Sequence, residues 1–164
     1  MNAWTLRALM PGDQDRVRAF ITEQWSAPIV VGYDHIHEPH TLPGFVAVEH
    51  QRWIGLITYH VAGAACEIVT LDSLVEGQGV GTALIDAVVN EARRLGCRRV
   101  WLITTNDNLH ALRFYQKRGF RIVAVHRGAV DRARQIKSSI PLIGNDGIPL
   151  HDEIELELML DQNL

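Results

Sequence analysis

Hydrophobic and polar residues follow two periods along the chain: an alternation of two, which predicts strands, and a spacing near 3.6, which predicts helices. Residues 3–9 alternate and predict an opening strand. Residues 11–13, with the sequence Pro-Gly-Asp, interrupt the alternation and begin a helix. The apolar face of this helix is formed by Val17, Phe20, Ile21 and Trp25. The chain is therefore expected to begin with a strand followed by a helix.

The middle of the chain is expected to contain a loop and three strands. Residues 26–44 hold three prolines, two glycines and three histidines without a clear period, which predicts an irregular loop or a short helical turn. Apolar runs at 45–49 and 53–61 are separated by a polar His-Gln-Arg segment and predict a hairpin, and residues 67–73 predict a third strand. Three consecutive strands favour an antiparallel meander.

The second half of the chain returns to helices. From 79 to 95 apolar residues recur at helical spacing, and Gly96 ends this predicted helix. The elements expected after it are a strand at 100–104, a helix through 108–119, a strand at 120–126, an amphipathic segment at 130–137, a loop at 141–149 and a strand at 154–160. This order predicts an α/β fold, of the α+β kind, in which a mixed sheet carries helices on both faces.

Composition narrows the class of protein. The 164 residues are 47% hydrophobic and 21% charged, which predicts a single globular domain over residues 1–164. The net charge is -3, so nucleic acid is not expected as a partner. No apolar run approaches the ~18 residues of a membrane span, and the first residues lack the pattern of a signal peptide, which predicts a cytoplasmic protein without membrane contact. Cys66 and Cys97 are expected to be reduced and buried.

The densest glycine run is the Glu-Gly-Gln-Gly-Val-Gly-Thr segment at 76–82, which lies between a predicted strand and the long helix. This arrangement presents backbone N–H groups and the positive end of a helix dipole to an anion. A Walker A loop requires a lysine after its last glycine, and the dinucleotide fingerprint requires another glycine spacing, so neither fits. The segment therefore predicts a phosphate-containing ligand bound by backbone N–H groups rather than by Lys or Arg.

The glycine loop and a second segment together resemble the GNAT superfamily of N-acetyltransferases. The family loop has the pattern Gln/Arg-x-x-Gly-x-Gly/Ala, to which residues 76–81 are similar. The family spacing Asn-x-x-Ala-x-x-Phe-Tyr-x-x-x-Gly-Phe is matched from Asn108 through Ala111, Phe114, Tyr115, Gly119 and Phe120. The strand at 67–71 also resembles the family's fourth strand, so the resemblance covers residues 65–126.

The resemblance implies a GNAT fold, with a mixed central sheet of about seven strands that is splayed in the middle. It also implies acetyl-CoA as the co-substrate, with the thioester carbonyl meeting backbone N–H groups at 71–73. By this resemblance, the residues expected to contact acetyl-CoA are Leu71, Asp72, Ser73, Gly77, Gln78, Gly79, Val80, Gly81, Thr82, Asn106, Asn108, Ala111, Phe114 and Tyr115.

Acetylation of an amine requires a deprotonated amine, stabilisation of the oxyanion and a proton for the leaving thiolate. The resemblance makes Tyr115 the candidate acid, although an aromatic residue here is also compatible with a purely packing role. Glu67 is the candidate general base, because it matches a strand glutamate that serves some family members directly or through a water. A glutamate at this position equally suits a solvent-facing strand, and Asp72 is the second candidate for the base.

Two features depart from the family pattern. Glu76 occupies a loop position where the family has Gln or Arg, and its carboxylate would repel a pyrophosphate. We expect Glu76 to point away from the ligand or to pair with a nearby arginine. The link from Leu71 to Glu76 is about two residues shorter than the common pattern, so the backbone groups that orient the thioester are assigned only to within one residue.

The sequence leaves the acceptor amine open, whether a small molecule or a peptide. The early loop with Tyr33, Asp34 and Glu38 is expected to border its pocket. The other wall of the pocket is expected to be formed by His126, His151 and the loop at 141–149. No metal is expected, because His35, His37 and His40 match no tetrahedral spacing with a fourth ligand.

Two further functions stay open, as does the oligomeric state. The chain is also compatible with a non-catalytic acyl-CoA-binding or regulatory domain of GNAT type, and with another nucleotide-binding α/β domain. The last strand, at 154–160, is expected to lie at an exposed edge of the sheet, where it could pair with the same strand of a second copy in a homodimer.

Overall fold

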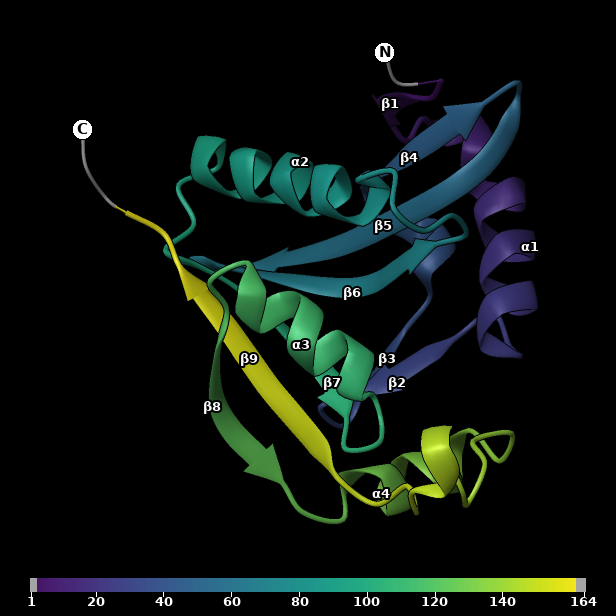
Figure 1. Ribbon diagram of the computed structural model, residues 1–164, viewed down its shortest axis with the longest axis vertical. Helices are drawn as coiled ribbons and strands as arrows, with labels where there is room; N and C mark the ends of the chain where they lie inside the picture. The colour runs from purple at the N-terminus through teal and green to yellow at the C-terminus, as the bar shows by residue number, and fades with distance from the viewer. Residues whose placement is uncertain (1–2, 162–164) are drawn as a thin grey trace.

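The computed structural model describes residues 3–161, which form a seven-stranded sheet, a separate two-stranded hairpin and four helices (Figure 1). The strands are β1 (Thr5–Ala8), β2 (Val30–Gly32), β3 (His35–His37), β4 (Gly44–Glu49), β5 (Arg52–Ala62), β6 (Ala65–Ser73), β7 (Arg99–Thr105), β8 (Arg121–His126) and β9 (Glu153–Met159). The helices are α1 (Gln14–Trp25), α2 (Val80–Arg94), α3 (Leu109–Lys117) and α4 (Ala129–Ile136). The predicted α/β class is confirmed.

The sheet is mixed and splayed at its centre. Its strand order is β1-β4-β5-β6-β7-β9-β8, and only the β6–β7 pair is parallel. The β6–β7 pairing runs from Ala65–Arg99 to Ile68–Leu102 and ends there, so the second half of β6 has no partner on this side. On its other side β6 contains a bulge at Val69, because Tyr59 pairs with Ile68 and Thr58 pairs with Thr70. The bulge and the lost pairing open a gap in the middle of the sheet.

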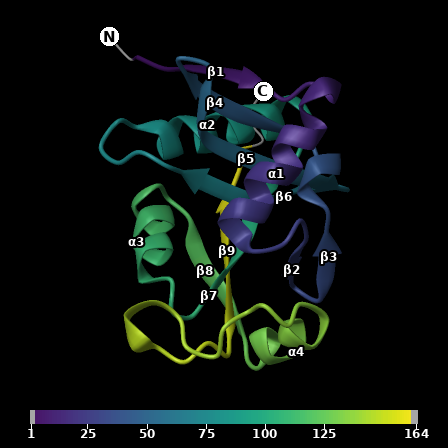
Figure 2. The same cartoon turned by 90° about the vertical axis from the view of Figure 1, so that its right-hand side faces the viewer.

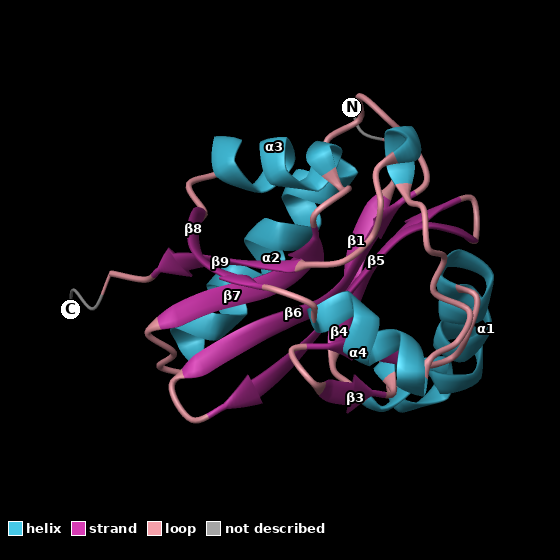
Figure 3. Cartoon of the chain, turned by 90° about the horizontal axis from the view of Figure 1, so that it is seen from below, coloured by secondary structure: helices cyan, strands magenta, loops and turns pink. Residues whose placement is uncertain are grey.

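Helices cover both faces of the sheet, as Figure 3 shows from below. On one face α2 buries Val80, Leu84 and Val88 against the central strands, and residues of α3 join the same core. The approach of α2 is close, because a Cβ on Gly55 of β5 would lie 2.6 Å from the Val80 side chain. On the other face α1 packs Val17, Phe20 and Ile21 against β4 and β5. Figure 2 shows the β2–β3 hairpin beside α1 on this second face.

Residues 26–44 are more ordered than the sequence predicts. The irregular loop expected there contains the antiparallel hairpin β2–β3, in which Val31 pairs with Ile36. The turn is made by Tyr33 and Asp34, whose φ angles of 51° and 58° suit the tight hairpin turns that match strand twist. Each strand has only three residues, so the alternation is too short to predict a strand.

The last strand is not an exposed edge, and this prediction is wrong. β9 lies between β7 and β8 and pairs antiparallel with both, while β1 and β8 are the outer strands. A homodimer through a free edge of β9 is therefore excluded. Alternation within one strand indicates which face is buried, but it carries no information about which strands pair with its two edges.

The described part of the chain contains neither a candidate membrane-spanning helix nor a candidate metal-binding cluster. Within residues 3–161 no helix is both long and apolar enough to cross a membrane. In the same residues no group of three or more His, Cys, Asp or Glu side chains is arranged to hold a metal ion. Cys66 and Cys97 are free and buried, as predicted.

Candidate active site

Three adjoining cavities follow the gap between β6 and β7. The first, here called the loop cavity, has a volume of about 680 Å³ and lies between the glycine loop and α3. The second, the gap cavity, of about 320 Å³, lies between β6, β7 and α1. The third, the hairpin cavity, of about 130 Å³, lies beside the β2–β3 hairpin. Neighbouring cavities share wall residues, so the three lie side by side along this gap; together they are here called the passage.

The wall of the loop cavity is built largely from backbone. Gly77 and Gly79 have φ angles of 72° and 75°, a conformation that side-chain-bearing residues rarely adopt. Helix α2 begins directly after Gly79, so the N–H groups of its first turn have no partner within the helix. A Cβ on Gly81 would lie 3.0 Å from the Phe114 ring, so this glycine also allows α3 to approach. The result is a helix N-terminus open to an anion.

An arginine completes this wall. Arg118, which follows α3, donates from Nε and Nη2 to the Thr82 hydroxyl at 3.0 and 2.7 Å, and from Nη1 to the Phe114 carbonyl at 2.8 Å. Its guanidinium lies 3.5 Å from the centre of the Phe114 ring. A fixed guanidinium beside a helix N-terminus favours phosphate. The sequence analysis expected backbone groups without Lys or Arg at this site, and the structure adds Arg118 to the wall of the cavity.

Tyr115 and Asp72 border both the loop cavity and the gap cavity. Burial, together with the nearby Asp72 carboxylate, raises the pKa of the Tyr115 phenol, so the group keeps its proton at neutral pH. Burial also raises the pKa of Asp72 to about 6, although the indole Nε1 of Trp25 donates a hydrogen bond to its Oδ2 at 2.9 Å. A protonated phenol and a carboxylate thus face the same space.

The hairpin cavity has two buried carboxylates in its wall. Glu67 of β6 is 7% exposed, and its Oε2 lies 3.3 Å from Nε2 of His37 on the hairpin. Glu153 of β9 is 3% exposed, and its Oε1 accepts the N–H of Tyr33 at 3.0 Å. Trp25 borders this cavity as well as the gap cavity. The passage therefore leads from a site that suits an anion to one that suits a cation.

Comparison with known proteins identifies the architecture. Residues 8–120 match the model of the Acetyltransferase (GNAT) family. The uncharacterized protein YdhI of Bacillus subtilis (strain 168) is 43% identical over 143 residues, which are 87% of this chain and 89% of that protein. The chain belongs to the GNAT acetyltransferase family.

Solved structures share its fold. The IAA acetyltransferase from Bacillus cereus ATCC 14579 superimposes with a TM-score of 0.74 at 20% identity, over 96% of this chain and 99% of that one. A GNAT family acetyltransferase from Elizabethkingia anophelis with acetyl-CoA bound superimposes with a TM-score of 0.66 at 21% identity, over 98% and 100% of the two chains. The predicted GNAT fold with a splayed sheet is confirmed.

Most of the cofactor residues predicted for this GNAT chain lie together in the wall of the loop cavity. They are Leu71, Asp72, Ser73, Gly77, Gly79, Val80, Gly81, Thr82, Asn108, Ala111, Phe114 and Tyr115. Gln78 is exposed and does not border this cavity. Glu76 borders the cavity and is exposed, and it forms no ion pair with the described residues, so the predicted pairing with an arginine is not found.

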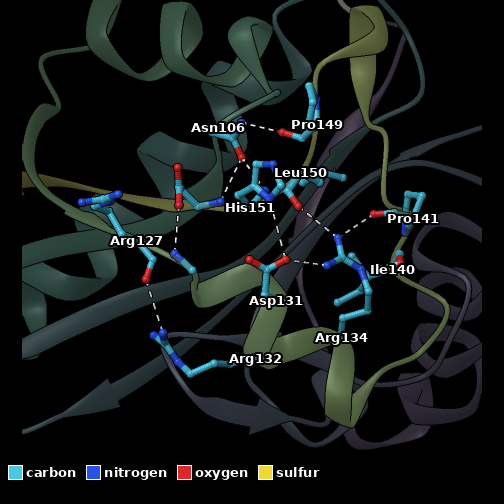
Figure 4. Close-up of polar contacts among 12 residues, drawn as sticks. Asn106, Arg127, Asp131, Arg132, Arg134, Ile140, Pro141, Pro149, Leu150 and His151 are labelled. Atoms are coloured by element: carbon cyan, nitrogen blue, oxygen red, sulfur yellow. Dashed lines mark hydrogen bonds and ion pairs between the residues drawn. The ribbon is translucent and has the colours of Figure 1, made fainter.

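Asn106, also predicted to contact the cofactor, lies outside the loop cavity and hydrogen-bonds to the backbone of residues 149–152 (Figure 4). Its Nδ2 donates to the Pro149 carbonyl at 2.9 Å, and its Oδ1 accepts the N–H groups of His151 and Asp152 at 3.1 and 3.0 Å. Asn106 borders none of the three cavities. It anchors the segment before β9, whereas Asn108 caps α3 by accepting the Ala111 N–H.

The predicted acceptor walls are found only in part. The hairpin borders the passage through Val30, Val31, Gly32 and His37, whereas the predicted Tyr33, Asp34 and Glu38 border none of the three cavities. His126 packs on the Tyr33 ring at 4.9 Å, but His151 is exposed and lies 3.7 Å from Asp131. The 141–149 loop borders none of the three cavities. Arg134 holds that loop through the carbonyls of Ile140, Pro141 and Leu150 (Figure 4).

Sequence reasoning missed three groups that shape the passage. Glu153 directly precedes the predicted last strand, and no pattern in the sequence indicates that the hairpin covers it. Arg118 follows a predicted helix and shows no motif of its own. Lys137 is buried after α4 and donates from Nζ to the Trp25 and Ile29 carbonyls at 2.8 and 3.2 Å. Burial lowers the pKa of Lys137, whose contacts fix the end of α1 beside the gap cavity.

Proposed function

We propose that this protein is an N-acetyltransferase that transfers the acetyl group of acetyl-CoA directly to a primary amine. The observation that carries the proposal is the passage, in which the loop cavity beside a helix N-terminus and the hairpin cavity with two carboxylates in its wall both adjoin the gap cavity between β6 and β7. A passage of this kind lets two substrates approach one point from opposite faces of the sheet. Membership of the GNAT family, and relatives of known structure that hold acetyl-CoA or CoA, support the choice of cofactor.

In this proposal the loop cavity binds the cofactor. The pyrophosphate accepts hydrogen bonds from the first N–H groups of α2, and Arg118 adds a positive charge. The pantetheine arm then runs between β6 and α3 into the gap cavity. Beyond Ile68 the backbone of β6 is not paired with β7, so its free N–H groups can meet the thioester carbonyl and the oxyanion that forms from it.

The acid and the base lie on opposite sides of this point. The amine nitrogen attacks the thioester carbon, and Glu67 accepts the proton that the amine loses. The carbon–sulfur bond then breaks, and Tyr115 supplies the proton that converts the thiolate into free CoA. We assign the base to Glu67 rather than Asp72, because Glu67 borders the hairpin cavity on the acceptor side. Asp72 borders the loop and gap cavities and already accepts the Trp25 indole N–H.

The proposal is tested by following CoA thiol release from acetyl-CoA with a panel of primary amines. The variant Glu67→Gln should lower kcat about 10²-fold at neutral pH, and the loss should shrink at high pH, where the amine loses its proton without a base. Asp72→Asn is the matched comparison and should retain most of the activity. Binding of acetyl-CoA without thiol release on any amine would favour the non-catalytic acyl-CoA-binding function instead.

A further inference from the structure

Three glutamates of β9 point to the same face of the sheet, but their surroundings differ. Glu155 contacts Nε2 of His126 at 3.1 Å and Nη1 of Arg99 at 3.3 Å, and Glu157 is paired with the same arginine. Glu153 has no Lys, Arg or His nitrogen within 4.0 Å among the described residues. It is therefore the glutamate of this strand whose charge is not balanced by a neighbouring side chain.

The contact that Glu153 does make does not require a charge. Its Oε1 accepts the Tyr33 N–H in the hairpin turn, a hydrogen bond that a glutamine could also accept. Burial raises the pKa of Glu153 and the Asp34 charge adds to this effect, while the Tyr33 hydrogen bond and the more distant charges of His126 and Arg132 oppose it only in part. An ionised carboxylate that is buried without a cation is costly. The hydrogen bond to the Tyr33 N–H therefore does not explain why position 153 is a glutamate rather than a glutamine.

Glu153 shares the hairpin cavity with Glu67. Glu67 stands beside Trp101 in the sheet register and Glu153 stands beside Thr105, so about 13 Å of β7 separates the two positions. The two carboxylates therefore reach the cavity from separate backbone positions. The wall of this cavity includes the apolar side chains of Val31, Ile68, Val69 and Ile103, together with the polar residues Thr104, Thr105 and Asn108. A narrow space with apolar side chains and two carboxylates in its wall suits an alkyl chain with a positive charge at each end.

We propose that Glu153 binds a second ammonium group of the acceptor, which is therefore an aliphatic diamine or a longer polyamine. The reacting amine lies at Glu67, the methylene chain contacts the apolar wall, and the other ammonium pairs with Glu153. This inference rests on the proposed function, because it names the acceptor of the same reaction. An ammonium group at Glu153 would supply the ion pair that this buried carboxylate of β9 does not form with the described residues.

The test compares three amines of equal chain length in the thiol-release assay: 1,4-diaminobutane, 4-aminobutan-1-ol and n-butylamine, with the propane and pentane series alongside. The wild-type protein should show a kcat/KM for the diamine about tenfold or more above that of the amino alcohol, because only the diamine forms the second ion pair. Increasing salt should reduce this preference.

The variant Glu153→Gln keeps an acceptor for the Tyr33 N–H and removes the charge. It should raise KM for the diamine and abolish the preference, while the kinetics of n-butylamine stay as in the wild type. Glu157→Gln is the matched control, because Glu157 lies on the same strand but borders none of the three cavities. It should retain the preference for the diamine.

The outcomes separate the two proposals. Equal kcat/KM values for diamine and amino alcohol in the wild type would overturn this inference and leave the proposed function intact, even if the variant failed to fold. A preference that survives Glu153→Gln would also overturn it. No thiol release with any amine would instead overturn the proposed function itself.

Discussion

The two ends of the passage are encoded in different ways. The loop cavity is built from two short stretches of chain, 71–82 and 108–118, and each of them carries its own local signal. The hairpin cavity combines Trp25, His37, Glu67 and Glu153, which belong to four separate elements. A site assembled from continuous segments is visible in the sequence, whereas a site assembled from distant strands is not.

The two ends of the passage also differ in charge and in whether backbone or side-chain groups line them. At the loop cavity an anion would meet backbone N–H groups and one fixed guanidinium. At the hairpin cavity a cation would meet two buried carboxylates. In the proposed function these opposite polarities would keep the two substrates on their own sides of the gap between β6 and β7.

The largest effect should come from Tyr115, which borders the loop cavity and the gap cavity. Tyr115→Phe keeps the ring that packs against Phe114 and Phe120 but removes the proton donor. We expect kcat to fall about 10²-fold or more, because the thiolate then leaves without general acid catalysis, while KM for acetyl-CoA changes little. Steady-state kinetics of thiol release measure both constants.

Tyr59→Phe is the control for this change, because Tyr59 is equally buried but borders none of the three cavities. It should retain normal kcat. A Tyr115→Phe protein with wild-type kcat would show that Tyr115 only packs. The passage would then contain no identified proton donor for the thiolate.

A smaller effect should be confined to the cofactor end. Arg118→Gln should weaken acetyl-CoA binding about tenfold, because it removes a charge-assisted contact to phosphate. The loss should diminish at high salt, and KM for the amine should not change. Isothermal titration calorimetry at two salt concentrations measures the effect. Arg113→Gln, an exposed change on the same helix, should bind normally, and equal Kd values for both variants would argue against a phosphate site at Arg118.

The smallest effect concerns stability. The pKa of Asp72 is about 6 in the folded protein against 3.8 ordinarily, so the folded state binds the extra proton between these values and stability falls as pH rises through them. Asp72→Asn keeps an acceptor for Trp25 and should increase the free energy of unfolding at pH 7.5 by ~1 kcal/mol, less than the full shift implies because the adjoining cavity admits solvent.

Urea unfolding at pH 7.5 and near pH 4 measures this difference, which should nearly disappear at the lower pH, where Asp72 is protonated. Asp86→Asn, on the exposed side of α2, should change stability little at either pH. A stabilisation of Asp72→Asn that is independent of pH would mean that the cost does not come from the buried charge.

Prediction from the sequence is best where the signal is local. The strand–loop–helix unit around Gly79 and the capped helix after Asn108 follow from residues close in the chain, because glycine conformation and capping act over a few positions. The hairpin at 30–37 was missed because three-residue strands give no readable period. The position of β9 was misjudged because the choice of neighbouring strands depends on long-range pairing.

The sequence alone thus determined the order of the elements outside the β2–β3 hairpin, the anion-binding loop and the resemblance to GNAT enzymes, because periodicity, turn chemistry and motif spacing are properties of neighbouring residues. Only the tertiary structure decided that Arg118 completes the loop cavity, that Asn106 serves as an anchor and that Glu153 is buried beneath the hairpin. Burial and charge balance are properties of the packed molecule. They depend on which distant strands and helices cover a residue, and local sequence patterns do not predict these contacts.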